Sequence, residues 1–358
     1  MSSSQHRRHP LLKCVLLLLT LLLAVCLYAG WDAWRFLHEA PESPGIGKIV
    51  DIEPGSNLVD VSLLLQKEGV ITSAKRFQIL ARLTEQSRSL QAGQFLVNTG
   101  WLPRQVLDQL VSGQSVLHRV TIPEGLPWWE VGEALEKNGM CRASDFREVI
   151  HDPDFLRKYG IPFASAEGFL YPDTYLVPKP REMDMNSARS FAGRMVDTFW
   201  RKTSPAWEAA GLGSRPPAAD LLRVLVLASI VEKETGLPEE RPRVAGVYVN
   251  RLNKGMALQA DPTVIYGLGP DFKGPLLRRN LEDDDNPYNT YRHPGLPPGP
   301  ICSPGLSAVE AALHPEKHNY LYFVATGKDK GHTFSATLSQ HNKAVRAYRQ
   351  ALRERGGS

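Results

Sequence analysis

The sequence lacks the motifs that build zinc, disulfide and nucleotide sites. Its four cysteines form no CxxC pair and no dense framework, which argues against a zinc site or a disulfide scaffold. No Walker, GxGxxG or GxSxG pattern occurs, so nothing indicates a nucleotide cofactor or a serine hydrolase. We therefore expect no cofactor and no resident metal ion.

The chain also lacks a strong excess of charge of either sign. It has 42 basic and 38 acidic side chains, and a net charge of +4 gives no case for a nucleic-acid partner. With 42% hydrophobic and 22% charged residues the composition is that of a globular protein. Because 358 residues exceed what one core usually holds, we expect two folded units.

One segment departs from this globular pattern. Residues 14–30 carry no charge and are rich in leucine, and with Leu11 and Leu12 they reach about the 20 residues that span a bilayer. Basic side chains precede the segment and Asp32 follows it, which favours a cytoplasmic N-terminus. We predict a cytoplasmic tail over residues 1–10, a transmembrane anchor over 11–30 and a linker over 31–47. A cleaved signal peptide is the alternative.

The part after the anchor contains a weak internal repeat. Residues 49–69 and 120–139 both read as a short strand, a turn and an amphipathic helix that stops at a glycine. The pairs Gly55/Gly125 and Gly69/Gly139 are among the identical positions. The repeat predicts small α+β modules that bind a polymer, although strand–turn–helix units also resemble one another without a common role.

The most informative segment is the helix predicted over residues 220–235. Leu221, Leu225 and Ala228 share one stripe with Glu232, and most other faces are apolar too, so we expect a central helix. Burial and the negative end of the helix dipole both raise the pKa of a carboxyl at Glu232, as a general acid requires. The alternative is a glutamate in solvent or paired with Lys233. Glu234, roughly 200° further round the helix, is predicted to lie on the surface.

The remainder is rich in glycine, proline and tyrosine. Residues 178–186 read as a loop and 187–202 as a helix, while 259–267 read as a turn that leads into a short strand. Residues 320–324 and 331–334 read as two further strands. Tyrosines beside asparagine and threonine suit sugar binding, because rings stack on pyranose faces and amides bind hydroxyls. The same aromatics would equally close a small β core.

Seven motifs together resemble one family. They are EGFLYPDTY at 167–175, LASIVEKET at 227–235, LQADPTVIYG at 258–267, YNTY at 288–291, GLPPGPI at 295–301, YLYFV at 320–324 and GHTF at 331–334. In this order they resemble the endolytic murein transglycosylase family, also called YceG-like. The resemblance implies an α+β protein with a LysM-like module over residues 48–118 and a YceG-like catalytic region over 119–358, whose core spans 160–350.

The resemblance implies a lyase that cleaves the β-1,4 bond between N-acetylmuramic acid and N-acetylglucosamine within nascent glycan strands. Such enzymes leave 1,6-anhydro-muramic ends and terminate strand elongation. The family's catalytic glutamate corresponds to Glu232, which would serve as acid and then as base, so we expect no second carboxylate of matching quality. Candidates for the glycan cleft are Asp261, Tyr266, Tyr288, Asn289, Tyr291 and His332.

The resemblance also implies a place and partners. The protein would sit in the inner membrane with its catalytic region in the periplasm, acting on peptidoglycan strands beside peptidoglycan synthases (penicillin-binding proteins). Two alternatives remain open from the residues: a murein-binding scaffold without catalysis, and a muramidase in which Asp261 is the second carboxylate beside Glu232.

Overall fold

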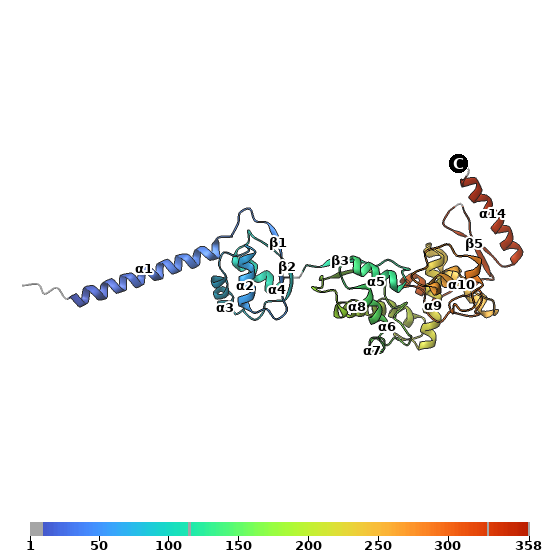
Figure 1. Cartoon of the computed structure of the whole chain (residues 1–358), viewed down its shortest axis with the longest axis horizontal. Helices are drawn as coiled ribbons and strands as arrows, with labels where there is room; N and C mark the ends of the chain where they lie inside the picture. Colours follow the sequence, from blue (N-terminus) through green and yellow to red (C-terminus); the bar gives the residue numbers. More distant parts are fainter. Residues whose placement is uncertain (1–9, 114–115, 328, 357–358) are drawn as a thin grey trace, which may run out of the picture. The chain divides into compact units, whose positions relative to one another are not determined.

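The protein has a mixed helix and sheet fold, as predicted. The computed structural model describes residues 10–113, 116–327 and 329–356, and Figure 1 labels many of the elements. Within these residues the strands form three two-stranded sheets. The chain divides into two compact units between His118 and Arg119.

The first element, α1 (Pro10–His38), contains the apolar segment. Its stretch Val15–His38 is the one helix in the described part of the chain that is long and apolar enough to cross a membrane. The helix continues through the first eight residues of the predicted linker. Phe36, only 4% exposed, joins the core of the first unit, and Asp32 accepts a 2.6 Å bond from Arg76. The end of α1 is therefore attached to this unit.

The first unit is a small α+β body. After α1 its elements are β1 (Gly47–Ile52), α2 (Leu58–Lys67), α3 (Ala74–Leu83), β2 (Gly93–Asn98) and α4 (Pro103–Ser112). β1 and β2 pair antiparallel from Gly47↔Asn98 to Ile52↔Gly93. Val50 and Ile52 of β1 and Phe95 and Val97 of β2 alternate with more exposed residues and are buried in the core of this unit, as the two-residue period of a strand allows.

The second unit is mostly helical. Its elements are β3 (His118–Thr121), α5 (Trp128–Lys137), α6 (Ala143–His151), α7 (Pro153–Lys158), β4 (Thr174–Val177), α8 (Met185–Ala209), α9 (Ala218–Glu234), η1 (Pro238–Glu240), α10 (Arg241–Asn253), α11 (Asp261–Leu268), α12 (Arg278–Leu281), α13 (Leu306–Leu313), β5 (Tyr322–Ala325), β6 (His332–Ser335) and α14 (Leu338–Gly356). The predicted pair of C-terminal strands is present, with Tyr322 opposite Ser335 and Ala325 opposite His332.

The repeat detected in the sequence is structural and longer than predicted. The order β1, α2, α3, β2 of the first unit returns in the second as β3, α5, α6, β4, with the additional short helix α7 before β4, and β3 pairs with β4 as β1 does with β2. The matched turn glycines Gly55 and Gly125 have φ of 82° and 79°, and Gly69 and Gly139 after the helices both have φ of 70°. These left-handed positions explain why glycine stands there in both copies.

One predicted element is wrong. Residues 259–267 do not form a turn and a strand, because the helix α11 begins at Asp261. An acidic residue in the first turn and a proline at the start, Pro262, favour a helix N-terminus and outweigh the β-branched residues that follow. The predicted helix over 187–202 is also longer at both ends, as α8.

Helix α9 lies at the centre of the second unit. It contacts α10, α11 and α13, and Figure 1 shows α10 beside it. Leu221 and every residue from Val224 to Val231 are buried, so the helix is apolar on nearly all sides, as predicted. It ends where Thr235 turns to an extended backbone ahead of Gly236. The last turn of this buried helix carries Glu232 to the point where other segments meet it.

Candidate active site

The segment 301–305 is fastened along α9 by hydrogen bonds to one serine. The Ser229 Oγ donates to the Val226 carbonyl at 2.8 Å and accepts from the Ile301 N–H at 3.1 Å. The Cys302 thiol lies 3.4 Å from the Ser229 carbonyl. These bonds hold the segment against the last turns of α9, so that the N–H of Gly305 lies within hydrogen-bond distance of Glu232.

Glu232 is held at both carboxylate oxygens. Oε1 accepts from Arg241 Nη2 at 2.7 Å, and Oε2 accepts from the Gly305 N–H at 3.0 Å. The Glu232 side chain is 5% exposed and that of Arg241 is 7% exposed. Each oxygen still has a free lone pair, so the fixed carboxyl can take or give a proton without moving.

Opposing effects act on the pKa of the Glu232 carboxyl. Burial raises the pKa of its carboxyl most, and the negative charge of Glu124 raises it further. The Gly305 N–H and the charges of Arg241 and Lys233 act in the opposite direction. The net pKa of Glu232 is above the ordinary value, as the sequence predicted, and burial, one of the two predicted causes, is the largest.

Three partners of Glu232 escaped the sequence analysis. Arg241 opens α10, Gly305 precedes α13, and Glu124 lies in the turn before α5, where its Oε2 accepts from Arg241 Nη2 at 3.3 Å. The turn is joined to the segment 301–305, since the Gly125 N–H donates to the Ser303 carbonyl at 2.9 Å. No local pattern in the sequence marks these residues, because Gly305 and Glu124 are 73 and 108 positions from Glu232, and Arg241, nine positions away, lies beyond the end of the helix.

A second buried carboxyl belongs to Glu167, in the EGFLYPDTY motif. It is 2% exposed and accepts from the backbone N–H of Trp128 at 2.9 Å and from that of Gly168 at 3.3 Å. It is also hydrogen-bonded to the Tyr266 side chain, and burial raises its pKa to about 7. The expectation that no second carboxylate of matching quality exists is therefore wrong.

Two of the candidate cleft residues, Tyr266 and Tyr288, lie beside Glu167. Their ring centroids are 4.8 Å apart, and the Tyr266 centroid is also 5.0 Å from that of Trp129. All three rings are partly buried. Trp129 follows the residue whose N–H is bound by Glu167, so the cluster adjoins the turn that carries Glu124.

Asp261 and Tyr291 lie elsewhere, with Glu234. The Tyr291 hydroxyl donates to Asp261 at 2.6 Å, and the Tyr248 hydroxyl donates to Glu234 at 2.8 Å. All four line a cavity of about 280 Å³. The prediction that Glu234 is a surface residue is wrong: it is partly buried, and burial raises the pKa of its carboxyl.

The last two candidates serve other contacts. The buried Asn289 donates from Nδ2 to the carbonyls of Asn280, Leu281 and Asp283, which fixes the loop after α12. The His332 Nδ1 lies 2.7 Å from Glu240 Oε2, one residue before Arg241. Of the six candidates, none has a hydrogen bond to Glu232 among the described residues.

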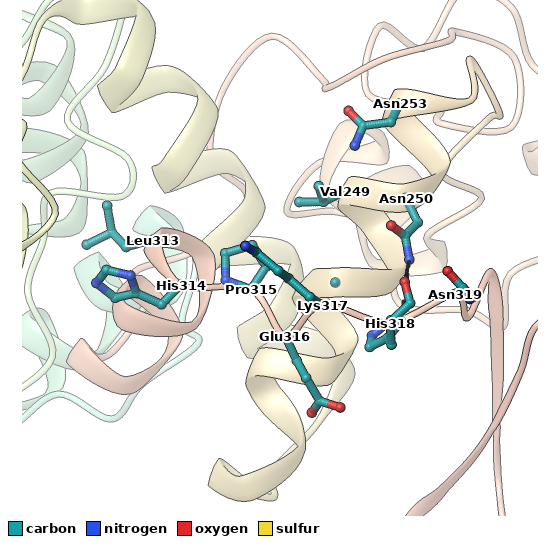
Figure 2. A pocket seen from close by; sticks show the side chains of 11 residues that line it. Val249, Asn250, Asn253, Leu313, His314, Pro315, Glu316, Lys317, His318 and Asn319 are labelled. Atoms are coloured by element: carbon teal, nitrogen blue, oxygen red, sulfur yellow. Dashed lines mark hydrogen bonds between the residues drawn. The ribbon is translucent and has the colours of Figure 1, made fainter.

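A larger cavity, of about 810 Å³, lies between α10 and residues 313–319 (Figure 2). His314 and His318 both line it but lie apart in this view. The Tyr320 N–H donates to His318 Nδ1 at 3.1 Å, and His318 Nε2 lies 2.9 Å from the Arg243 carbonyl. Both ring nitrogens of His318 are used within the fold, and none of the six candidate cleft residues lines this cavity.

Comparison with known proteins gives consistent results. A family model described as the YceG-like family matches residues 50–347. A Bacillus subtilis (strain 168) protein named endolytic murein transglycosylase is 30% identical over 322 residues, covering 86% of this chain and 86% of that protein. A Streptococcus pneumoniae serotype 2 (strain D39) protein of the same name is 26% identical over 325 residues, and the chain spans only 57% of its length.

A solved structure is similar as well. The crystal structure of a YceG-like protein from Listeria monocytogenes has a TM-score of 0.54 and 31% sequence identity. The match covers 84% of this chain and 99% of that one.

Proposed function

The chain belongs to the YceG-like family, and from this premise we propose that it is a peptidoglycan lytic transglycosylase with Glu232 as its catalytic residue. The relatives named endolytic murein transglycosylase support this activity. The observation that carries the assignment of the residue is the buried Glu232 carboxyl at the end of α9, held by Arg241 and the Gly305 N–H.

The proposed reaction cleaves the bond between muramic acid C1 and the glucosamine O4 inside a glycan strand. Glu232 in its protonated form donates to the leaving O4 as the C1–O4 bond breaks. The C6 hydroxyl of the same muramic acid then forms the new C1–O6 bond and gives its proton to the Glu232 carboxylate. One group thus serves both proton transfers, and the intramolecular hydroxyl replaces water as the nucleophile.

The contacts of Glu232 fit this cycle. Burial favours the protonated form needed for the first transfer, whereas Arg241 and the Gly305 N–H stabilise the carboxylate that results. The carboxyl plane is fixed by bonds to both oxygens, which spares the reaction the cost of orienting it.

The contacts of Asp261 favour the transglycosylase over the rival muramidase, in which Asp261 is the second carboxylate. Asp261 is bound by Tyr291 and acts electrostatically on Glu234, whereas the acidic neighbour of Glu232 is Glu124. The cluster of Trp129, Tyr266 and Tyr288 supports a glycan-binding surface, because such rings stack on pyranose faces. We keep Tyr266 and Tyr288 as proposed glycan contacts, and assign Asn289 to the shaping of its loop.

The setting is proposed from the apolar helix and the family. The α1 helix would anchor the protein in the inner membrane with its N-terminus cytoplasmic and the catalytic region periplasmic. The first unit would be the LysM-like murein-binding module. Peptidoglycan synthases would be the partners that supply nascent strands, whose growth the cleavage terminates.

The experiment that tests the function is a digestion of purified murein by the full-length protein in detergent, with the products weighed. Anhydro-ended muropeptides support the proposal, because each is lighter by one water than a hydrolysed reducing end. Reducing ends would identify a muramidase, and the absence of any release would identify a binding scaffold.

A further inference from the structure

Two carboxylates share one nitrogen of a buried arginine. Arg241 Nη2 donates to Glu232 Oε1 at 2.7 Å and to Glu124 Oε2 at 3.3 Å. The exposed fractions of the three side chains differ sharply: 5% for Glu232, 7% for Arg241 and 49% for Glu124. The buried Glu232 and the half-exposed Glu124 therefore both bind the same guanidinium group, that of Arg241.

The turn that carries Glu124 does not need a carboxylate in order to fold. Its counterpart in the first copy of the repeat has Pro54 at the matched position, before Gly55 with φ of 82°. The same turn with the same left-handed glycine thus forms without any acidic side chain there. Glu124 is explained by what it faces, namely Arg241 and Glu232.

The opposite wall leaves room for this carboxylate. A Cβ added at Gly305 would overlap the carboxyl group of Glu124, so this carboxyl group occupies the space that a side chain at Gly305 would fill. Gly305 therefore contributes twice: its N–H donates to Glu232, and its lack of a side chain leaves space for the Glu124 carboxyl group.

The protonation cycle gives Glu124 its role. When Glu232 takes up a proton it loses its charge, and an unpaired guanidinium buried to this degree is costly. Glu124 offers a second acceptor on the same nitrogen, so the cation remains paired. Its negative charge also repels that of the Glu232 carboxylate. Both effects favour the protonated form of Glu232, the form that donates to the leaving oxygen.

Few other charged or titratable groups act on Glu232. Lys233, on the same helix, donates to the Gly125 carbonyl at 3.2 Å and lowers the pKa of Glu232. The Cys302 thiol on the segment 301–305 is buried, which raises its own pKa and keeps it neutral. Among the described residues neither group has a hydrogen bond to Arg241, whereas Glu124 shares the Arg241 Nη2 with Glu232.

We propose that Glu124 is a positioning residue of the reaction: it holds the buried Arg241 guanidinium whenever Glu232 carries the catalytic proton. This inference rests on the proposed function, in which Glu232 is the proton donor. It names no contact between Glu124 and the substrate, since Glu124 acts through Arg241.

The test is the pH profile of murein digestion by full-length Glu124→Gln. Without the second carboxylate, Arg241 serves Glu232 alone and stabilises its charged form, so the alkaline limb of the profile moves to lower pH. We expect a loss of at least about threefold on the alkaline side that disappears on the acid side. Glu124→Asp, which keeps the charge, should stay nearer to the wild type.

The matched control is Glu133→Gln, an exposed glutamate on α5 in the helix that follows the turn, and its profile should equal that of the wild type. An unmoved limb in Glu124→Gln would overturn the inference. So would an equal loss at every pH, which would make Glu124 a reacting group, as in a two-carboxylate hydrolase. Glu232→Gln is measured alongside: if that variant keeps full activity, the proposed function itself has failed.

Discussion

Arg241 and Glu232 form an ion pair of 2.7 Å in which neither side chain is more than 7% exposed. The pair joins the first residue of α10 to the last turn of α9 across the turn between them. Buried pairs of this kind contribute little net stability when intact, but loss of one partner leaves an uncompensated charge. The consequences of breaking it can therefore be predicted with their dependence on pH.

Replacement of Arg241 by glutamine should destabilise the protein by about 3–5 kcal/mol at neutral pH. The folded-state pKa of Glu232 is already above its unfolded value, and loss of Arg241 raises it further. The folded state then holds a proton that the unfolded state releases, so stability falls as pH rises from about 4 towards neutrality. The difference in Tm between wild type and Arg241→Gln, followed over this pH range, should grow with pH.

The control for this prediction is Arg243→Gln on the same helix. Arg243 pairs with Glu316 at 3.1 Å, but both side chains are about 40% exposed. Such a pair contributes at most about 1 kcal/mol. If the Tm difference between wild type and Arg241→Gln stayed constant across pH, it would contradict the claim that loss of Arg241 raises the pKa of Glu232.

Glu167 should make a second contribution to the pH dependence of stability, separate from that of Glu232. Its folded-state pKa of about 7 lies above the unfolded value of about 4.3, so its contribution to stability is lost as pH rises from about 4 to 7. Glu167→Gln cannot ionise and should remove up to on the order of 3 kcal/mol of this pH dependence. Tm measured from pH 4 to 8 should fall less steeply in Glu167→Gln than in wild type.

The exposed Glu148 on α6 serves as the matched control, since Glu148→Gln should leave the pH dependence of Tm as it is. If Glu167→Gln followed the wild-type curve, the carboxyl would be ionised in the folded protein throughout. Its bond to Tyr266 would then need another explanation.

The elements that the sequence predicted well are those with local signals. The apolar stretch before a glycine and a proline placed α9 within two residues of its observed start and one of its end, and located Glu232 on it. The left-handed glycines marked the repeat. In α11 two local signals conflict: the β-branched residues favour a strand, but Pro262 at the helix start outweighs them, so the predicted strand is wrong.

The rest depends on contacts between distant segments. Spacing on the helix correctly turned Glu234 away from Glu232, but α10 covers that side too, and Tyr248 binds it there. Arg241 reaches Glu232 from the start of α10, whereas Gly305 and Glu124 lie near it only because the segment 301–305 and the turn before α5 meet the last turn of α9. A helical period carries no information about such partners.

The first unit should contribute binding and not chemistry. Removal of residues 48–114 with the anchor kept should weaken sedimentation with murein sacculi, while the masses of the products remain those of the wild type. The unit divides from the catalytic region next to His118, so the deletion leaves the second unit whole. Unchanged murein binding would instead assign the first unit a purely structural role.

The central claim is that Glu232 carries both proton transfers, and the most direct measurement is murein digestion by full-length Glu232→Gln with the products weighed. Glutamine keeps the size and can still accept from Arg241 or Gly305, so folding and murein binding should remain near normal. Proton transfer typically contributes about 10²–10⁴-fold, so we predict a loss of at least that size, against wild-type products that are anhydro-ended. Full activity of Glu232→Gln, or wild-type products with reducing ends, would contradict the account.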